Sequence, residues 1–231
     1  MTAPVAAPAY LYRLPGLTSY AAGLALQQEL AAARSQHALP DTIVVLEHEP
    51  VVTLGPRTDE AADLPDRALL AMRGIDVAET DRGGRATYHG PGQLVAYPIV
   101  DLTRLGRDLR AYVAALQQAV VETLASVGVE GSPRQGAEFV GVWVGERKIA
   151  SIGVQVSGWI ASHGLALNVT RASAEPFGLF TPCGLPGLEV TSVEQETGRA
   201  PDLDALAETL AARLADALHL ALEPVPTGAL G

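Results

Sequence analysis

The amino-acid sequence predicts a mixed β-sheet flanked by helices, an α/β (α+β) fold. Segments with strand and helix character are interleaved without the strict alternation that a doubly wound parallel sheet requires. No repeat, low-complexity linker or break in composition divides the chain. A chain of 231 residues, 48% of them hydrophobic, can bury the core of one large domain. We therefore expect one domain over 1–231, with an ordered core at about 9–222 and flexible tails at 1–8 and 223–231.

Capping residues and apolar patterns predict the individual elements. Thr18 or Ser19 can cap a first helix, and Asp108 begins the strongest helical pattern of the chain. Thr191 with Glu194 resembles a capping box for a short helix. Helices are expected at 20–36, 65–73, 108–128, after 191, and at 202–220. Strands are expected at 41–50, 51–55, 74–80, 86–89, 94–100, 139–144, 148–156 and 159–169.

Charge and cysteine content exclude several classes of protein. Sixteen Lys and Arg residues against 26 Asp and Glu give a net charge of −10, whereas a general nucleic-acid binder presents a basic surface. The N-terminus lacks the pattern of a signal or transit peptide, and no apolar stretch is long enough for a membrane helix. One cysteine cannot form an internal disulfide, which fits a reducing compartment. We expect a cytoplasmic protein with neither a membrane nor a nucleic-acid partner.

The stretch from Asp81 to Ile99 combines glycines with arginine, threonine, histidine and glutamine side chains, and continues into an apolar strand. Glycines allow a backbone to approach a ligand closely, and the interleaved polar side chains are typical of a pocket wall. The alternative is a surface turn between two strands. The length of the stretch favours a binding loop on a rigid scaffold.

The chain contains one cysteine, Cys183, and one lysine, Lys148, so no other residue can supply a thiol or an amine side chain. Cys183 lies between a proline and a glycine in a loop, where a thiol is either a nucleophile or an incidental loop residue. Lys148 is the single lysine among sixteen basic residues and begins an apolar strand. Apolar surroundings suit a lysine to acid–base work, and the alternative is a solvated hairpin residue beside Glu146 and Arg147.

The five histidines show no metal-binding pattern. His89 and His163 each precede a glycine and are expected to line one pocket from opposite loops. Neither has metal-ligand spacing with another His, Cys or carboxylate, so no zinc site is expected. His37 and His219 are expected on helix faces, and His48, between two glutamates, has no assigned role.

Four segments together resemble the lipoyl(octanoyl) transferase family. They read RGGRATYHGPGQLVAYPI, GVWVGERKIASIGVQV, ASHGLALNV and TPCG, and with the preceding strands the match spans well over half of the chain. The resemblance implies a fold similar to the catalytic domain of biotin and lipoate protein ligases. Two departures lie before Cys183: FTPCG lacks an expected isoleucine and asparagine before its proline, and RASAEPFG is about one residue longer than usual.

The resemblance also implies roles for individual residues. Cys183 would be the acyl-thioester nucleophile, and Lys148 would activate that thiol and transfer protons. The walls of the acyl pocket would be formed by Arg82, Gly83, Gly84, Arg85, Ala86, Thr87, Tyr88 and His89, by Ser151, Ile152 and Gly153, and by Gly164, Leu165 and Ala166. The small side chains would leave an apolar tunnel open, and His89 would shape the pocket rather than carry protons.

The implied reaction transfers an octanoyl group from acyl carrier protein to the lysine of lipoyl domains. The acceptors would be the lipoyl domains of 2-oxoacid dehydrogenase complexes and the glycine cleavage H protein. Because a thioester is already activated, no nucleotide or other cofactor is expected, and the sequence has no GxxxxGK[ST] phosphate loop.

Two other functions are compatible with such a scaffold: an ATP-dependent lipoate or biotin ligase, which would not need Cys183, and a non-catalytic acyl-binding module. Arg104, Arg107 and Arg110 follow the glycine-rich stretch and form either a basic docking patch for the acidic carrier or ordinary helix-end charges.

Overall fold

The computed structural model describes residues 6–64, 67–136 and 138–226. Its strands are β1 (Ala7–Thr18), β2 (Asp41–His48), β3 (Val51–Leu54), β4 (Asp76–Glu79), β5 (Thr87–His89), β6 (Gln93–Asp101), β7 (Ser132–Pro133), β8 (Gly141–Val144), β9 (Arg147–Ser157), β10 (Ile160–Asn168) and β11 (Leu220–Glu223). Its helices are α1 (Tyr20–Ser35), α2 (Glu60–Asp63), α3 (Arg67–Met72), α4 (Leu109–Ser126), α5 (Arg171–Ala174), α6 (Val193–Thr197) and α7 (Leu203–Ala217), with 3₁₀ turns η1 (Leu102–Leu105), η2 (Glu175–Leu179) and η3 (Pro182–Gly184).

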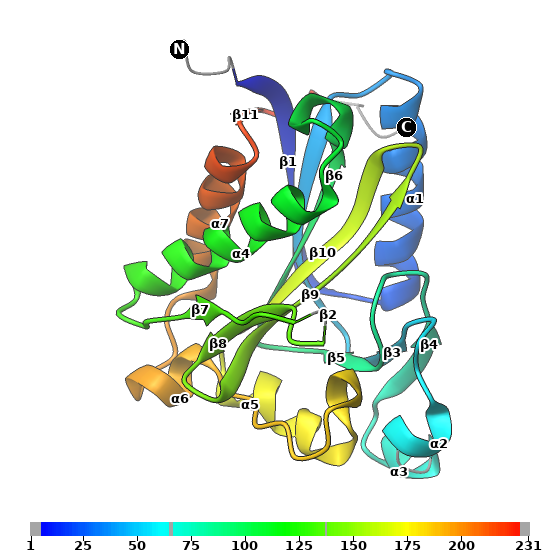
Figure 1. Ribbon diagram of the computed structural model, residues 1–231, viewed down its shortest axis with the longest axis vertical. Coiled ribbons are helices and arrows are strands. Elements are labelled where there is room, and N and C mark those ends of the chain that lie inside the picture. The colour runs from blue at the N-terminus through cyan, green and yellow to red at the C-terminus, as the bar shows by residue number, and fades with distance from the viewer. Residues whose placement is uncertain (1–5, 65–66, 137, 227–231) are drawn as a thin grey trace.

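The expected mixed sheet is confirmed. In the larger sheet the strand order is β11-β1-β2-β6-β10-β9-β8-β7, and in a smaller sheet it is β4-β3-β5 (Figure 1). β1 pairs in parallel with β2 and β11, whereas β2, β6, β10, β9 and β8 form an antiparallel run. The sheet is therefore parallel at β11, β1 and β2 and antiparallel from β2 onward, where β8–β9 and β9–β10 are joined as hairpins.

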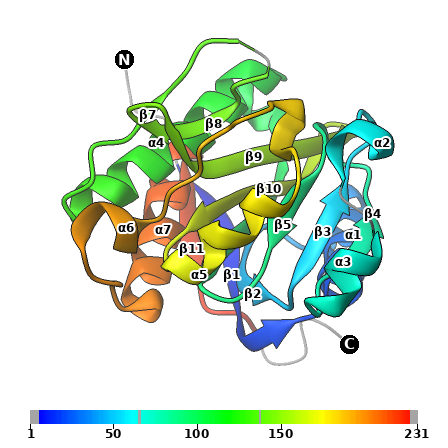
Figure 2. The ribbon, with the colours of Figure 1, turned by 90° about the horizontal axis from the view of Figure 1, so that it is seen from below.

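Helices cover both faces of the larger sheet (Figures 1 and 2). α4 and α7 pack on one face, where Leu116, Leu124 and Leu210 join the main hydrophobic cluster. α1 covers the other face through a second cluster that includes Leu30 and the β6 strand. The smaller sheet has its own cluster, which lies beside the 3₁₀ turn η2. These layers leave the central strands β6 and β10 between two packed surfaces.

Two long helices begin where the sequence predicts. The Ser19 hydroxyl accepts a hydrogen bond from the Ala22 N–H at the start of α1. The Asp108 carboxylate accepts from the N–H groups of Arg110 and Ala111 at the start of α4, at 2.9 and 3.0 Å. Side-chain oxygens thus satisfy N–H groups that a helix cannot pair internally.

The chain ends form strands that the sequence analysis did not predict. β1 already includes Ala7 and Pro8, and β11 extends to Glu223, so the ordered region reaches beyond 9–222 at both ends. The last helix ends at Ala217 instead of continuing to Leu220, because the chain turns at His219 (φ +54°) and pairs with β1. Of the expected tails, 1–5 and 227–231 lie outside the described residues.

Smaller corrections concern caps and loops. The cap of α6 is Ser192 rather than Thr191: its hydroxyl accepts from the Gln195 N–H at 3.3 Å, and Thr191 bonds to Glu196 instead. The segment around Cys183, expected to be a loop, contains η2 and η3. His37 and His219 lie in turns with positive φ after helices, not on helix faces. Within the described residues, no helix has the length and apolar character needed to cross a membrane.

Candidate active site

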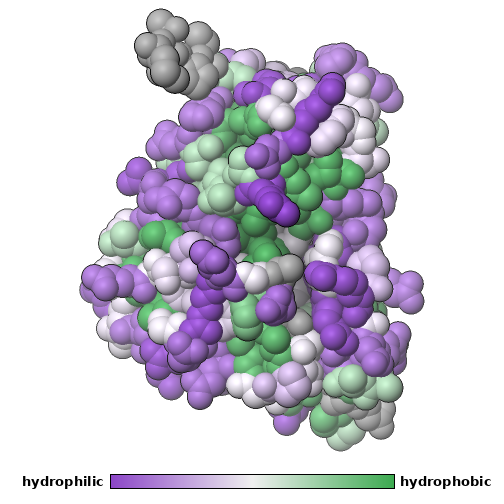
Figure 3. Space-filling model, viewed as in Figure 1, coloured by the Kyte–Doolittle hydropathy of each residue, from purple (hydrophilic) through white to green (hydrophobic). Residues whose placement is uncertain are grey.

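A cavity of about 560 Å³ lies between the glycine-rich loop, β9, β10 and the η3 turn. It brings together segments that are far apart in the sequence. The predicted residues that line it are Lys148, Arg82, Gly83, Gly84, Arg85, Thr87, His89, Ser151, Ile152, Gly153, Gly164, Leu165 and Ala166. Figure 3 shows a hydrophobic strip down the middle of one face, flanked by hydrophilic side chains, over the region of β9 and β10 beside the start of α4.

Ala86 and Tyr88, which were also expected in the first wall, are not among the residues that line the cavity. Both side chains are buried in the cluster of the smaller sheet, and the Tyr88 ring meets Phe177 edge-on at 5.9 Å. Because side chains alternate between the two faces of a strand, Thr87 and His89 on β5 face the cavity while Tyr88 points away from it.

Lys148 is buried in the cavity wall, with only 3% of its surface exposed. The solvated hairpin alternative is therefore wrong for this residue, although it describes Arg147 well. The Lys148 N–H donates to the Glu189 carbonyl, and its own carbonyl accepts from the Thr191 N–H, each at 2.9 Å. Its ammonium nitrogen lies 5.6 Å from the centre of the Trp143 ring, within the range of a cation–π interaction.

Cys183 lies on the η3 turn, and its side chain is outside the described part of the structure. The next two residues, Gly184 and Leu185, line the cavity. Gly184 has φ +68°, and a Cβ placed there would lie 2.5 Å from Cδ of Arg85. The turn is therefore packed closely on Arg85, whose guanidinium forms an ion pair with Asp63 at 2.8 Å.

Arg82 is buried, and much of its hydrogen bonding holds the glycine-rich loop itself. Its guanidinium donates to the hydroxyl of Thr53 at 2.7 Å, and to the carbonyls of Thr53 and Arg85 at 2.9 Å. The Gly83 N–H donates to the Val154 carbonyl at 3.0 Å, which fastens the loop to β9. The loop therefore has a fixed shape against the sheet.

Two glycines permit close backbone packing at this junction. A Cβ on Gly153 would lie 2.9 Å from the Gly83 carbonyl oxygen, so the loop could not approach β9 as it does. A Cβ on Gly164 would lie 2.3 Å from the Ala96 carbonyl oxygen of the neighbouring strand. Gly164 thus serves strand packing in addition to leaving space in the cavity.

Histidine and tyrosine rings form part of the cavity wall. Tyr20, Tyr97, His89 and His163 line it, and His48 contacts three of these rings at centroid distances between 5.5 and 5.9 Å. His48 is fully buried and bonds to the Thr18 carbonyl at 2.8 Å and to the Tyr97 hydroxyl at 2.7 Å. We call these five residues the ring cluster.

Burial determines the charge of the ring cluster. It lowers the pKa of His48, and it lowers the pKa of His89 well below the usual value, with His48 and Arg82 adding to the effect. Burial also lowers the pKa of His163, although a 2.8 Å hydrogen bond to Asp81 opposes it. The three imidazoles are therefore neutral at pH 7.

His89 and His163 lie on the strands β5 and β10, not on loops, and each has a definite partner. His89 Nδ1 is 2.8 Å from the Gln93 side-chain oxygen. The main-chain N–H of His163 donates to the side-chain oxygen of Gln27 at 2.7 Å, and His163 has φ +56°. Among the described residues, no group of three or more His, Cys, Asp and Glu side chains is arranged to hold a metal ion.

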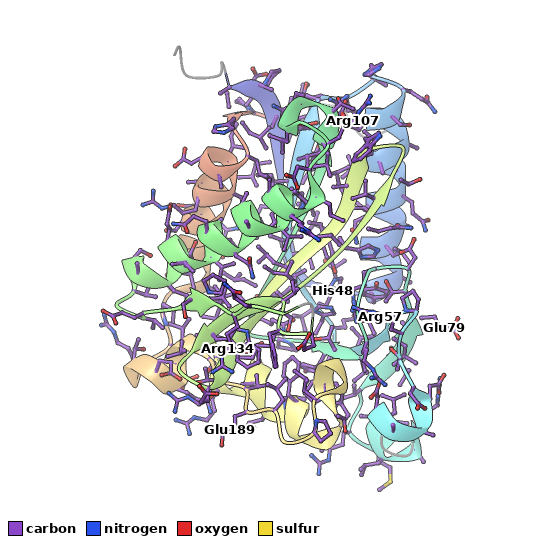
Figure 4. The ribbon with its side chains drawn as sticks, viewed as in Figure 1. His48, Arg57, Glu79, Arg107, Arg134 and Glu189 are labelled. Carbon is purple, nitrogen blue, oxygen red and sulfur yellow. The ribbon has the colours of Figure 1, made fainter. Side chains whose placement is uncertain are left out.

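Sequence reasoning did not assign several other cavity residues. Tyr20 and Leu109 lie outside the recognisable motifs, whereas Tyr97 and Val154 lie within them. Arg57 follows β3 and is exposed at the rim (Figure 4). The remaining ones are Tyr20, Tyr97, Leu109, Val113, Glu138, Val140, Val154, Gly184 and Leu185. Of these, only the tyrosines and Glu138 carry polar groups, so the additions make the cavity more apolar.

The combination of this sheet, these walls and a buried lysine defines a catalytic domain of the lipoate-ligase type. The family model described as the lipoyl protein ligase A/B catalytic domain matches residues 19–215. A lipoate-protein ligase A bound with ATP has a similar structure, with a TM-score of 0.70, 16% identity and coverage of 96% of this chain and 90% of that one. A biotin protein ligase from Aquifex aeolicus gives a TM-score of 0.57 at 16% identity, over 90% of this chain and 70% of that one.

Relatives of higher identity narrow this class. A protein named octanoyltransferase from Rubrobacter xylanophilus is 47% identical over 189 residues, covering 81% of this chain and 83% of that protein. Another octanoyltransferase, from Chloroflexus aurantiacus, is 43% identical over 212 residues, covering 90% of this chain and 93% of that protein. The chain therefore belongs to the lipoyl(octanoyl) transferase family within the lipoyl protein ligase A/B catalytic domains, and it is an acyltransferase.

Proposed function

We propose that this enzyme transfers an octanoyl group from octanoyl-acyl carrier protein to the lysine of lipoyl domains, through a thioester on Cys183. The acceptors are the lipoyl domains of 2-oxoacid dehydrogenase complexes and the glycine cleavage H protein. The observation that best supports this is the burial of Lys148 in the wall of the cavity that Gly184 and Leu185 also line. A cytoplasmic site of action belongs to the same proposal and rests on the single cysteine.

In the first half-reaction the thiolate of Cys183 attacks the carbonyl carbon of the donor thioester. The bond between that carbon and the carrier sulfur breaks, and the leaving thiolate takes a proton from the Lys148 ammonium. The products are octanoyl-Cys183, the free carrier thiol and a neutral Lys148. Main-chain N–H groups near the glycines hold the oxyanion in this proposal.

In the second half-reaction the acceptor lysine arrives as an ammonium ion. Neutral Lys148 removes one proton, and the resulting amine attacks octanoyl-Cys183. An amide bond forms, the bond between the acyl carbon and the Cys183 sulfur breaks, and the amide nitrogen loses a second proton to solvent. The enzyme returns to its starting state, with a thiolate and a charged Lys148.

The rest of the cavity supplies shape and an apolar surface. Ile152, Val154 and Leu165 provide apolar side chains along the cavity, and the ring cluster contributes neutral aromatic ones. An eight-carbon chain gains from leaving water along such a surface. In this proposal His89 bounds the space without exchanging protons, because its pKa is far below neutrality and its Nδ1 bonds to Gln93.

An assay without nucleotide tests the proposal. The enzyme is incubated with octanoyl-carrier protein and a lipoyl domain, with and without ATP, and the mass of the lipoyl domain is followed. We expect octanoylation at the same rate in both samples. Octanoylation only with ATP, and from free octanoate, would instead indicate a ligase. Binding of octanoyl-carrier protein without any transfer would indicate an acyl-binding module.

A further inference from the structure

One exposed surface combines aromatic, aliphatic and cationic side chains beside the cavity. It is formed by Arg107, Leu109, Arg110 and Trp159, and we call it the Arg107 surface. Leu109 and Trp159 are 45% and 39% exposed and belong to the few large hydrophobic side chains exposed in the described structure. The Arg107 guanidinium lies 5.6 Å from the centre of the Trp159 ring. Exposed tryptophan and arginine together are typical of protein interfaces.

The charges of this surface differ from the sequence-based expectation. Arg104, expected in the same patch, is bound to the buried Asp41 at 2.6 Å and serves the fold. Arg107 and Arg110 are exposed and have no ion-pair partner among the described residues. The acidic neighbour Asp108 is directed to the helix N-terminus, where it accepts two main-chain hydrogen bonds. The result is a local cationic area on a chain of net charge −10.

The Arg107 surface is continuous with the cavity. Leu109 belongs to both, and Val113, one turn further along α4, lines the cavity together with Val154 of β9. Figure 4 places Arg107 at the end of the molecule where the β9–β10 hairpin turns, away from Glu189 and Arg134 at the other end. A molecule seated on this surface can therefore reach the cavity without crossing another element.

The length of the partner's reactive arm favours the donor over the acceptor. Lys148 and Ser157 are separated by nine residues of the strand β9, which spans roughly 30 Å at the usual rise per residue. Trp159 follows directly after Ser157. The side chain of an acceptor lysine cannot cover most of that distance from a domain docked here. The long prosthetic arm of a carrier protein can extend along the cavity from Leu109 toward the catalytic end.

We propose that the Arg107 surface docks the acidic carrier protein that delivers the octanoyl thioester. This inference rests on the proposed function, of which it specifies the donor side. Arg107 and Arg110 attract the acidic face of the carrier, Trp159 and Leu109 contact its apolar side chains, and the acyl-bearing arm passes Val113 into the cavity.

Charge reversal tests this docking. The double variant Arg107→Glu/Arg110→Glu is compared with the control Arg73→Glu/Arg199→Glu. The control reverses two exposed arginines that lie outside the cavity and form no ion pair within the described residues. Each changes the net charge from −10 to −14, since every reversal removes one positive and adds one negative charge. The measurement is the rate of octanoyl-enzyme formation from octanoyl-carrier protein and from octanoyl-pantetheine, which has no protein part.

We expect the surface variant to lose about tenfold or more in kcat/KM with the carrier protein and to match wild type with octanoyl-pantetheine. The control variant should match wild type with both donors. An equal loss with both donors, or no loss with the carrier, would overturn the assignment. If the control variant lost the same kcat/KM with the carrier protein, the assignment would also be overturned, because the loss would then reflect overall charge alone.

Two further readouts separate this inference from the proposed function. Transfer from preformed octanoyl-enzyme to a lipoyl domain should be unchanged in the surface variant; impairment there alone would assign the surface to the acceptor. Binding of unacylated carrier protein, measured by biolayer interferometry, does not depend on the chemistry. Weaker binding by the surface variant supports docking even where no octanoyl-enzyme forms, and unchanged binding contradicts it.

Discussion

Lys148, the single lysine of a chain whose other basic residues are arginines, is buried in the cavity wall. An ammonium group can give up its proton during a reaction, whereas a guanidinium keeps its proton at working pH. Main-chain bonds to 189 and 191 hold the backbone of Lys148, and its ammonium nitrogen lies 5.6 Å from the centre of the Trp143 ring. The chemical difference between the two basic side chains therefore matters more here than at any exposed arginine.

Lys148→Arg should lower the rate of octanoyl transfer by about 100-fold or more, the range expected when a general acid–base group is lost. The matched control is Arg147→Lys, because Arg147 is the exposed neighbour on the same strand and pairs with Glu196. Rates of transfer to a lipoyl domain measure both variants. A fully active Lys148→Arg enzyme would show that Lys148 does not exchange protons.

Cys183→Ser should abolish transfer and leave the fold intact, because a serine hydroxyl is far harder to ionise than a thiol while the volume change is small. Circular dichroism checks the fold, and mass spectrometry of the lipoyl domain checks transfer. Transfer by Cys183→Ser or Cys183→Ala at nearly the wild-type rate would contradict the role of Cys183 as nucleophile.

His89→Asn should reduce turnover by less than about 100-fold and leave the pH dependence of kcat/KM in place. Burial holds the pKa of His89 well below its usual value, so the imidazole stays neutral over the working pH range. The measurement is a pH profile of wild type and variant side by side. A changed profile together with a loss as deep as that of Cys183→Ala would transfer the proton-carrying role to His89.

Sequence reasoning named most of the residues that line the cavity, because they lie in short contiguous segments that fold next to one another. It placed Ala86 and Tyr88 in the pocket because it treated a segment as a continuous wall, whereas a strand turns alternate side chains away. It missed Tyr20 and Tyr97, which line the cavity from α1 and β6, and His48, which contacts both rings from β2. No local pattern distinguishes such residues from ordinary core residues.

At the scale of elements, the contact between β9 and the glycine-rich loop sets the shape of the cavity. Gly83 bonds to Val154, and the absence of a side chain on Gly153 makes that approach possible. A small change on β9 should therefore be transmitted to the loop, which carries Arg82 and Arg85 into the cavity.

Gly153→Ala should destabilise the protein by about 1–3 kcal/mol and raise the KM for the octanoyl donor, because its Cβ would lie 2.9 Å from the Gly83 carbonyl oxygen. Gly178→Ala is the matched control: Gly178 has open space around its Cβ position and no positive φ. Urea unfolding and donor titration measure both variants. Equal unfolding free energies and equal donor KM values in the two variants would show that the loop moves to accommodate the new side chain without loss of stability or binding.

Two of the strands that sequence patterns did not reveal, β1 and β11, lie at the chain ends, and the short elements α2, β7 and α5 were missed as well. β11 follows α7 with leucines that continue the helical pattern, so only its pairing with β1 distinguishes it as a strand. β1 contains Pro15 and Gly16 and changes register between Arg13 and Leu17. The parallel pairing of β1 with β11 joins residues more than two hundred positions apart, and no local signal encodes it.

At the scale of the whole molecule, three buried neutral histidines link stability to pH. Their folded-state pKa values are lowered by burial, whereas an unfolded histidine titrates near 6.5. As pH falls below about 6.5 the unfolded state binds protons that the folded state does not, so the folded state loses stability. The effect is absent above that pH, where both states are neutral.

The free energy of unfolding should therefore fall between pH 6.5 and 5, by up to about 1.4 kcal/mol per pH unit for each histidine that stays neutral. Urea unfolding at several pH values measures the slope. His48→Gln should reduce it, because one proton-binding difference is removed, and exchange of the exposed His37 for Gln should not. An unchanged slope in His48→Gln would show that His48 is protonated in the folded protein.

The most direct test of the account isolates the acyl-enzyme. Wild-type enzyme is mixed with octanoyl-carrier protein without ATP, separated from the donor, digested and mapped by mass spectrometry, and a second portion is mixed with a lipoyl domain. The account predicts one octanoyl group on the peptide that contains Cys183, and its transfer to the lipoyl domain without further donor. An octanoyl group on any other residue, or an acyl-enzyme that the lipoyl domain cannot discharge, would contradict it.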